Sequence, residues 1–218
     1  MRKLCFIFFL ALPLISAEIK DKQKNIYKEV KSPYTGKVWL DRNLGATKAC
    51  ESYDDYECYG DYYQWGRGAD GHQKRFVSDT FALSASDTPG HKDLILTNYE
   101  PYDWREKQND QLWQGVDGIN NPCPKGFRLP TIDELKHETL QNGVKNRQDA
   151  LTSFLKLPAA GFRNRYNTSL NLSQAAIGSY WTSSLNHEKV KNVEFTSEKS
   201  FEGEVYRTYA CSVRCIKD

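Results

Sequence analysis

The cysteines limit the folds open to this chain more than any other residue type does. The sequence contains six, one of which lies in the N-terminal apolar segment. In an oxidising compartment the other five allow two disulfides and leave one thiol over. Cys50 and Cys58 flank a short polar loop that a disulfide between them would close. Cys123 has no near neighbour in the sequence, so we expect its partner to be Cys211 or Cys215.

The N-terminal segment has the pattern of a cleaved secretion signal. Arg2 and Lys3 precede an apolar run over residues 4–14, and residues 15–17 include the small side chains that signal peptidase requires. The run is about a dozen residues long, whereas a membrane-spanning helix needs ~20. We therefore expect a signal peptide at residues 1–17, no membrane span, and a protein that is secreted or held in the periplasm or at the cell surface.

The charge balance argues against a nucleic-acid partner. The whole sequence has 30 basic and 28 acidic side chains. Removing residues 1–17 takes away two basic residues and no acidic ones, which brings the basic side chains down from 30 to the same 28 as the acidic ones. A nucleic-acid-binding protein needs a clear excess of basic side chains on one surface. About two hundred residues remain, which is enough for one well-buried domain.

The sequence pattern mixes short strands with two helices, which predicts an α+β fold. Thr131, followed three residues later by Glu134, has the pattern of a capping box and predicts the start of a helix. A second helix is expected over residues 146–156, where apolar side chains recur on one face. Strands are expected at 26–30, 37–40, 157–163 (a strand and turn), 178–184, 190–195, 204–209 and 211–216.

A long excursion separates the two halves of the predicted domain. Residues 67–121 are rich in Gly, Asp, Ser, Asn and Pro, and their aromatic residues follow no clear period. The segment has too many aromatic residues for a disordered linker, and excursions of this kind often carry function. We expect a polar, mobile leader at residues 18–25 and then a single domain over residues 26–218, with a loop insertion at residues 67–121.

Two segments resemble the signature of a known family. Residues 121–131 (NPCPKGFRLPT) and 211–218 (CSVRCIKD) are similar to the FISUMP domain, the Fibrobacter major paralogous family, and residues 26–66 resemble its opening half more weakly. The resemblance implies a C-type-lectin-like fold, with two main helices packed on twisted antiparallel sheets and long loops. It also implies the pairing of Cys123 with Cys215, because the family's closing motif matches residues 212–215, and so leaves Cys211 unpaired.

An enzymatic alternative comes from the same resemblance. Residues 128–134 are shared with formylglycine-generating enzymes, which are similar in fold and need two copper-binding cysteines close together. Cys211 and Cys215 are the candidate pair, but residues four apart in a strand lie about 13 Å from each other. Zinc would need a CxxC pair or a His/Cys cluster, and neither is present. We therefore expect no catalysis and no metal centre.

Calcium is the one cofactor that the sequence leaves open. Residues 100–102 (EPY) and 108–110 (QND) are near misses of the calcium motifs of C-type lectins. Acidic and amide side chains within residues 54–57 and 117–121 could supply some of the six to eight oxygens that calcium takes. Acidic loops are usually only solvated, so no cofactor is expected. The four histidines are scattered and are expected on the surface.

An aromatic and basic set near the last strands is the predicted ligand-binding surface. Aromatic faces stack on sugar rings, and arginine donates hydrogen bonds to hydroxyls or carboxylates. In lectin-like folds the loop face beside these strands commonly binds ligand, although Trp181 and some of the tyrosines could instead fill the core. The residues predicted to contact ligand are Arg163, Arg165, Tyr166, Tyr180, Trp181, Tyr206 and Arg207.

The predicted function is therefore that of a secreted bacterial binding protein that recognises a glycan or a cell-surface protein. The alternative is a structural or adhesive component of an extracellular assembly, with residues 67–121 as its interface. The binding hypothesis predicts exposed aromatic side chains around one groove, whereas the assembly hypothesis predicts a large apolar patch on the long loop.

Overall fold

The computed structural model of this chain describes residues 18–164 and 174–218. The predicted signal peptide, together with Arg165 and Tyr166 of the predicted surface, lies outside the described residues. Residues 18–25, expected to form a mobile leader, are instead held against the domain. Strand β1 (Ile19–Lys20) pairs with β2 (Ile26–Tyr27), and the buried Asp21 carboxylate accepts a hydrogen bond from the Tyr27 hydroxyl at 2.7 Å.

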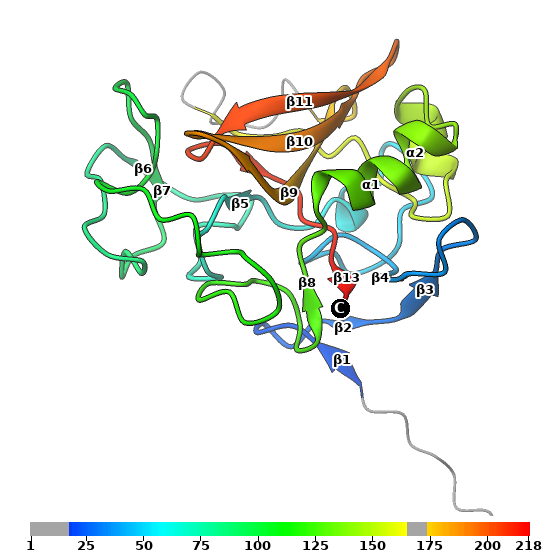
Figure 1. Cartoon of the computed structure of the whole chain (residues 1–218), viewed down its shortest axis with the longest axis horizontal. Coiled ribbons are helices and arrows are strands. Elements are labelled where there is room, and N and C mark those ends of the chain that lie inside the picture. Colours follow the sequence, from blue (N-terminus) through cyan, green and yellow to red (C-terminus); the bar gives the residue numbers. More distant parts are fainter. Residues whose placement is uncertain (1–17, 165–173) are drawn as a thin grey trace, which may run out of the picture.

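The fold is α+β, and its two largest sheets in the described residues are antiparallel. The larger strands, β9 (Gly178–Asn186), β10 (Lys189–Phe195) and β11 (Ser200–Tyr206), form a three-stranded sheet in the order β11-β10-β9. Short strands form a four-stranded sheet in the order β3-β4-β13-β8. These are β3 (Glu29–Lys31), β4 (Val38–Leu40), β8 (Phe127–Arg128) and β13 (Ile216–Lys217). Figure 1 shows the three-stranded sheet above the four-stranded one, with the helices to one side.

The last strand lies beside strands from earlier parts of the chain. In strand β13 Ile216 pairs with Trp39 of β4 and with Arg128 of β8, so the last strand sits between segments from the first and middle parts of the sequence. Figure 1 shows the C-terminus within this sheet. The disulfide between Cys123 and Cys215 joins the same regions, and a second disulfide joins Cys50 to Cys58. Both predicted pairings are confirmed, and Cys211 is a buried free thiol.

The helices begin where the sequence predicts. Helix α1 (Ile132–Glu138) starts with a complete capping box, in which the Thr131 side chain accepts from the Glu134 N–H and the Glu134 side chain accepts from the Thr131 N–H. A short 3-10 helix, η2 (Leu140–Asn142), follows and ends at Gly143, whose φ is +88°. Helix α2 (Arg147–Thr152) is shorter than expected. The chain turns back after it, and the Leu157 N–H donates to the Ala150 carbonyl.

The predicted strand over residues 211–216 is wrong as one element, because the chain there crosses from one sheet to another. Strand β12 (Ala210–Cys211) pairs with β5 (Tyr63–Gln64), whereas β13 pairs in the four-stranded sheet. Between them the Ser212 carbonyl accepts from the Trp181 N–H, and the Val213 carbonyl accepts from the Leu44 N–H. The alternating apolar pattern therefore marks a buried crossing rather than a continuous strand.

The insertion at residues 67–121 contains structure of its own. Strands β6 (Asp79–Thr80) and β7 (Leu94–Ile95) pair in parallel, and Figure 1 shows them on the side away from α2. Ile95, Trp104 and Trp113 are fully buried in the same core cluster as Trp181. Aromatic anchoring holds the insertion on the domain, as its composition predicts. A 3-10 turn, η1 (Tyr56–Cys58), completes the elements of the described residues.

Candidate functional site

The structure buries some of the predicted ligand-binding residues in the core and places others at the surface or in a cleft. Tyr180 and Trp181 lie in β9 with no exposed surface. The Tyr180 hydroxyl donates to the Pro158 carbonyl at 2.8 Å, and the Trp181 indole N–H donates to the Tyr63 carbonyl at 2.6 Å. The prediction of ligand contact is therefore wrong for both residues. Strand β9 is covered on both faces, so successive side chains of opposite orientation are both buried.

Arg207 is also an internal residue. Its side chain is 1% exposed, and its guanidinium lies 4.8 Å from the centre of the Trp65 ring. Its Nη2 donates to Asp110 at 2.6 Å, which ties the end of the last hairpin to the insertion. The prediction of ligand contact is wrong for Arg207 as well. Tyr206 is partly exposed and packs on Tyr102 with ring centres 4.6 Å apart, and its role in binding stays a prediction.

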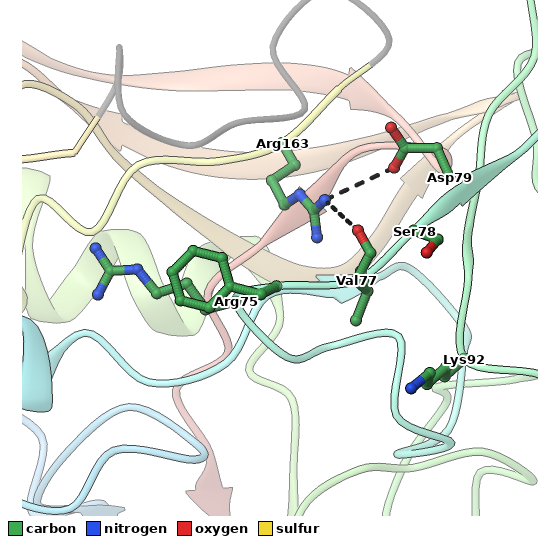
Figure 2. Close-up of a pocket in the computed structure, with 7 residues that line it drawn as sticks. Arg75, Val77, Ser78, Asp79, Lys92 and Arg163 are labelled. Carbon is green, nitrogen blue, oxygen red and sulfur yellow. Dashed lines mark hydrogen bonds and ion pairs between the residues drawn. The ribbon is translucent and has the colours of Figure 1, made fainter.

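Among the predicted ligand-binding residues that the structure describes, Arg163 lines a cleft. A cleft of about 410 Å³ is lined by Arg75, Phe76, Val77, Ser78, Asp79, Lys92 and Arg163, and is called the Arg163 cleft below. Figure 2 shows the Arg163 guanidinium close to Val77 and Asp79, with Arg75 and Lys92 on opposite sides. Six of these seven residues come from the insertion, as residue numbers 75–79 and 92 show.

Backbone pairing fixes the Arg163 side of the cleft. The Arg163 N–H donates to the Ala210 carbonyl, and the Ala210 N–H donates to the Arg163 carbonyl, both at 2.9 Å. The side chain is 4% exposed, its Nη2 donates to the Val77 carbonyl at 3.4 Å, and it lies 3.7 Å from an Asp79 oxygen. Burial lowers the pKa of Arg163, and the Asp79 carboxylate acts in the opposite direction. An arginine remains charged at neutral pH even so.

A buried arginine holds the wall that carries Lys92. Arg67 has no exposed surface, and its guanidinium donates to the carbonyls of His91 and Asp93, each at 2.8 Å. These carbonyls flank Lys92, so the backbone on both sides of the lysine is fixed. Gly71 packs directly against it with a φ of +110°, and a Cβ there would lie 2.9 Å from the Lys92 Cβ. The lysine side chain itself is exposed.

An aromatic ring and an arginine form the other wall. Phe76 is 88% exposed, the highest fraction among the exposed large hydrophobic side chains of the described residues. The Arg75 guanidinium lies 4.6 Å from the centre of the Tyr56 ring, and its Nη2 donates to the side-chain oxygen of Gln174. The cleft thus offers one open aromatic face beside several hydrogen-bond donors.

A fully buried histidine is the polar feature that the sequence reasoning missed. His72, expected on the surface, has no exposed area, and its Nδ1 lies 2.6 Å from an Asp70 oxygen. Its Nε2 accepts from the Gln64 N–H at 3.0 Å, which assigns the ring proton to Nδ1. Burial lowers the pKa of His72 to about 4. Because both ring nitrogens are engaged, this histidine has a structural role; the Asp-Gly-His spacing was the only signal of it.

Four of the residues considered for calcium have other partners: Asp55, Glu57, Asn120 and Asn121. Lys48 pairs with Asp55 at 2.7 Å and with Glu57 at 3.3 Å. The Asn120 and Asn121 amide groups donate to backbone carbonyls. Over residues 18–164 and 174–218, no group of three or more His, Cys, Asp or Glu side chains is placed to hold a metal ion.

Fold and cleft together define an α+β protein with two disulfides and a basic cleft formed largely by an insertion. In comparisons with known proteins, no family model matches the chain, and no curated protein or solved structure matches it. No helix within the described part of the chain has the length and apolar character needed to cross a membrane.

Proposed function

We propose that this chain is a secreted, non-catalytic bacterial protein with a C-type-lectin-like domain of the FISUMP type, and that it binds a glycan in the Arg163 cleft. The two disulfides and the N-terminal signal pattern support export. The segments quoted above support the family assignment, and the α+β architecture with long loops is compatible with it.

The composition of the cleft is the observation that carries the proposal. Sugars are bound by aromatic faces that contact the ring and by polar groups that bond to its hydroxyls. Phe76 supplies the open face, and Arg75, Lys92 and Arg163 supply donors. The volume of about 410 Å³ falls within the range of small-ligand sites, about 300–1,000 Å³.

A glycan array probed with the exported protein tests this proposal. We expect saturable binding to a subset of glycans, measured once with calcium and once with a chelator to establish whether a metal takes part. Phe76→Ala should lower the affinity about tenfold, because an exposed stacking contact is lost. Phe81→Ala is the matched control, since Phe81 is 61% exposed on the same insertion but does not line the cleft.

Two outcomes would count against the proposal. Absence of binding across the array, in both conditions, would refute glycan recognition. Binding that Phe76→Ala leaves unchanged would place the ligand outside the Arg163 cleft.

A second candidate function is assembly into an extracellular structure. Three further apolar side chains of the insertion are well exposed: Phe81 at 61%, Tyr99 at 81% and Ile119 at 63%. Exposed apolar side chains mark interfaces when they gather in one patch. If they form an interface, sedimentation should show concentration-dependent association that the double variant Phe81→Ala/Tyr99→Ala abolishes.

A further inference from the structure

We infer that the Arg163 cleft selects glycans that carry a negatively charged group, a carboxylate or a sulfate. This inference rests on the proposed function and adds the chemical class of the ligand.

The charge of the lining residues supports this selectivity. Arg75, Lys92 and Arg163 are cationic, and Asp79 is the one carboxylate among the seven lining residues. Asp79 lies nearest to Arg163, at 3.7 Å. The described lining residues therefore give the cleft an excess of positive charge.

Two of the three cations have no acidic partner among residues 18–164 and 174–218. Arg75 contacts the Tyr56 and Phe76 rings and the Gln174 amide, all of which are neutral. Lys92 is exposed and makes no ion pair with any described residue. An incoming anion would gain from these charges without displacing an existing carboxylate.

The positive excess distinguishes this cleft from two other hollows of the described residues. Another hollow is lined by the cations Lys28, Arg42 and Lys48 and by the acids Asp41, Glu51 and Asp55, so its charges balance. There Arg42 pairs with Asp41 at 3.0 Å and Lys48 pairs with Asp55 at 2.7 Å. A third hollow contains Asp110 and no cation. A further hollow, lined by Lys20, Lys22 and Lys125 with Asp21, has an equal excess but no aromatic side chain in its lining. The formal net charge of the whole chain is only +2, so the excess does not reflect a generally basic surface.

The geometry suits an anion that is attached to a ring. A guanidinium matches the two oxygens of a carboxylate or sulfate, whereas Lys92 acts as a mobile point charge. Phe76 stands beside these cations with most of its surface open. A uronic acid or a sulfated sugar presents both an anionic group and a ring face, and inorganic phosphate presents only the former.

Matched oligosaccharides test the inference by titration calorimetry on the exported protein. We compare an oligogalacturonate, its methyl ester, and a neutral and a sulfated oligosaccharide of equal length. The acidic or the sulfated ligand should bind at least about tenfold more tightly than its uncharged counterpart, because charge-assisted hydrogen bonds are stronger than neutral ones. This advantage should shrink as salt is raised, since screening weakens charge interactions.

A lysine pair supplies the variant and its control. Lys92→Gln should weaken binding of the charged ligand about two- to fivefold more than binding of the uncharged ligand, the scale of an exposed charge interaction, because glutamine keeps a hydrogen-bond donor and loses the charge. Lys145→Gln should change neither, because Lys145 is an exposed lysine without an ion pair in the described residues. Lys145 precedes α2 by two residues in the sequence, and Figure 1 shows α2 on the opposite side of the molecule from β6. Unfolding curves of both variants establish that the fold is retained.

The possible outcomes distinguish failure of the charge selectivity from failure of glycan binding itself. Equal affinity for charged and uncharged ligands would overturn the charge selectivity while leaving glycan binding intact. Absence of binding to all four ligands and to the array would overturn both. Competition by inorganic phosphate as effective as that of the charged oligosaccharide would also overturn the inference, because the ring would then contribute nothing.

Discussion

His72 illustrates at the scale of one residue how burial determines the state of a side chain. Desolvation lowers its pKa from 6.5 to about 4, so the folded protein keeps the imidazole neutral where the unfolded chain would protonate it. The unfolded state therefore binds more protons between these two pKa values. The free energy of unfolding should fall as the pH drops from 6.5 to 4.

The substitution His72→Gln measures this effect. Between pH 7 and pH 5 the wild-type protein should lose about 2 kcal/mol of stability through His72 alone, at about 1.4 kcal/mol for each pKa unit. Urea unfolding at pH 7 and pH 5 gives the free energy of unfolding at each pH. The decrease between the two pH values should be about 2 kcal/mol smaller in His72→Gln than in the wild-type protein. His137→Gln, at an exposed position of α1, should behave as the wild type does. An identical pH dependence in wild type and His72→Gln would contradict the prediction.

The candidate site shows what a residue pattern can and cannot predict. Arg163 lines the candidate cleft, and its contact with ligand stays a prediction that rests on the chemistry of arginine near the last strands. The burial of Tyr180 and Trp181 could not be predicted from the sequence pattern, because it depends on segments that cover both faces of β9. The rest of the cleft comes from residues 75–79 and 92, which no period or motif in the insertion distinguishes.

Local bonding makes the start of α1 the most predictable element. The capping box involves only residues three apart, so the sequence contains the whole interaction. Residues 211–216 are the contrary case, since their division between β12 and β13 depends on pairing with β5, β4 and β8. Elements held by distant partners are the ones that a sequence pattern describes least well.

The substitution Thr131→Ala tests the contribution of the cap. Loss of the side-chain acceptor leaves the Glu134 N–H without its partner at 3.2 Å and should cost about 1 kcal/mol of stability. Thr88→Ala is the control, because Thr88 is exposed and its hydrogen bonds to the described Ser86 use its backbone rather than its hydroxyl. Denaturant unfolding should show the loss in the first variant and a change within about 0.5 kcal/mol in the second. Equal stability of the two variants would show that the cap is dispensable.

The whole molecule depends on contacts between segments that are far apart in the sequence. One core cluster combines Tyr27, Trp65, Trp104, Phe127 and Val213, which come from β2, the residue that follows β5, the insertion, β8 and the closing segment. The α+β class was predictable from the mixture of helical and strand patterns. The aromatic composition of the insertion predicted that the insertion packs on the domain. It did not predict which of its residues are buried, because its aromatic residues follow no period.

The two disulfides allow a test of how chain topology contributes to overall stability. Cys123–Cys215 closes a separation of 92 residues and Cys50–Cys58 one of 8, while all four cysteines are buried. Replacing each pair by alanine removes similar buried groups, so the difference should reflect loop closure. On the chain-entropy relation the long loop contributes about 4–5 kcal/mol and the short loop about 2–3 kcal/mol. Denaturant unfolding should therefore find Cys123→Ala/Cys215→Ala less stable by about 2 kcal/mol than Cys50→Ala/Cys58→Ala. Equal stability of the two double variants would show that native packing, rather than restriction of the unfolded chain, determines what these disulfides contribute.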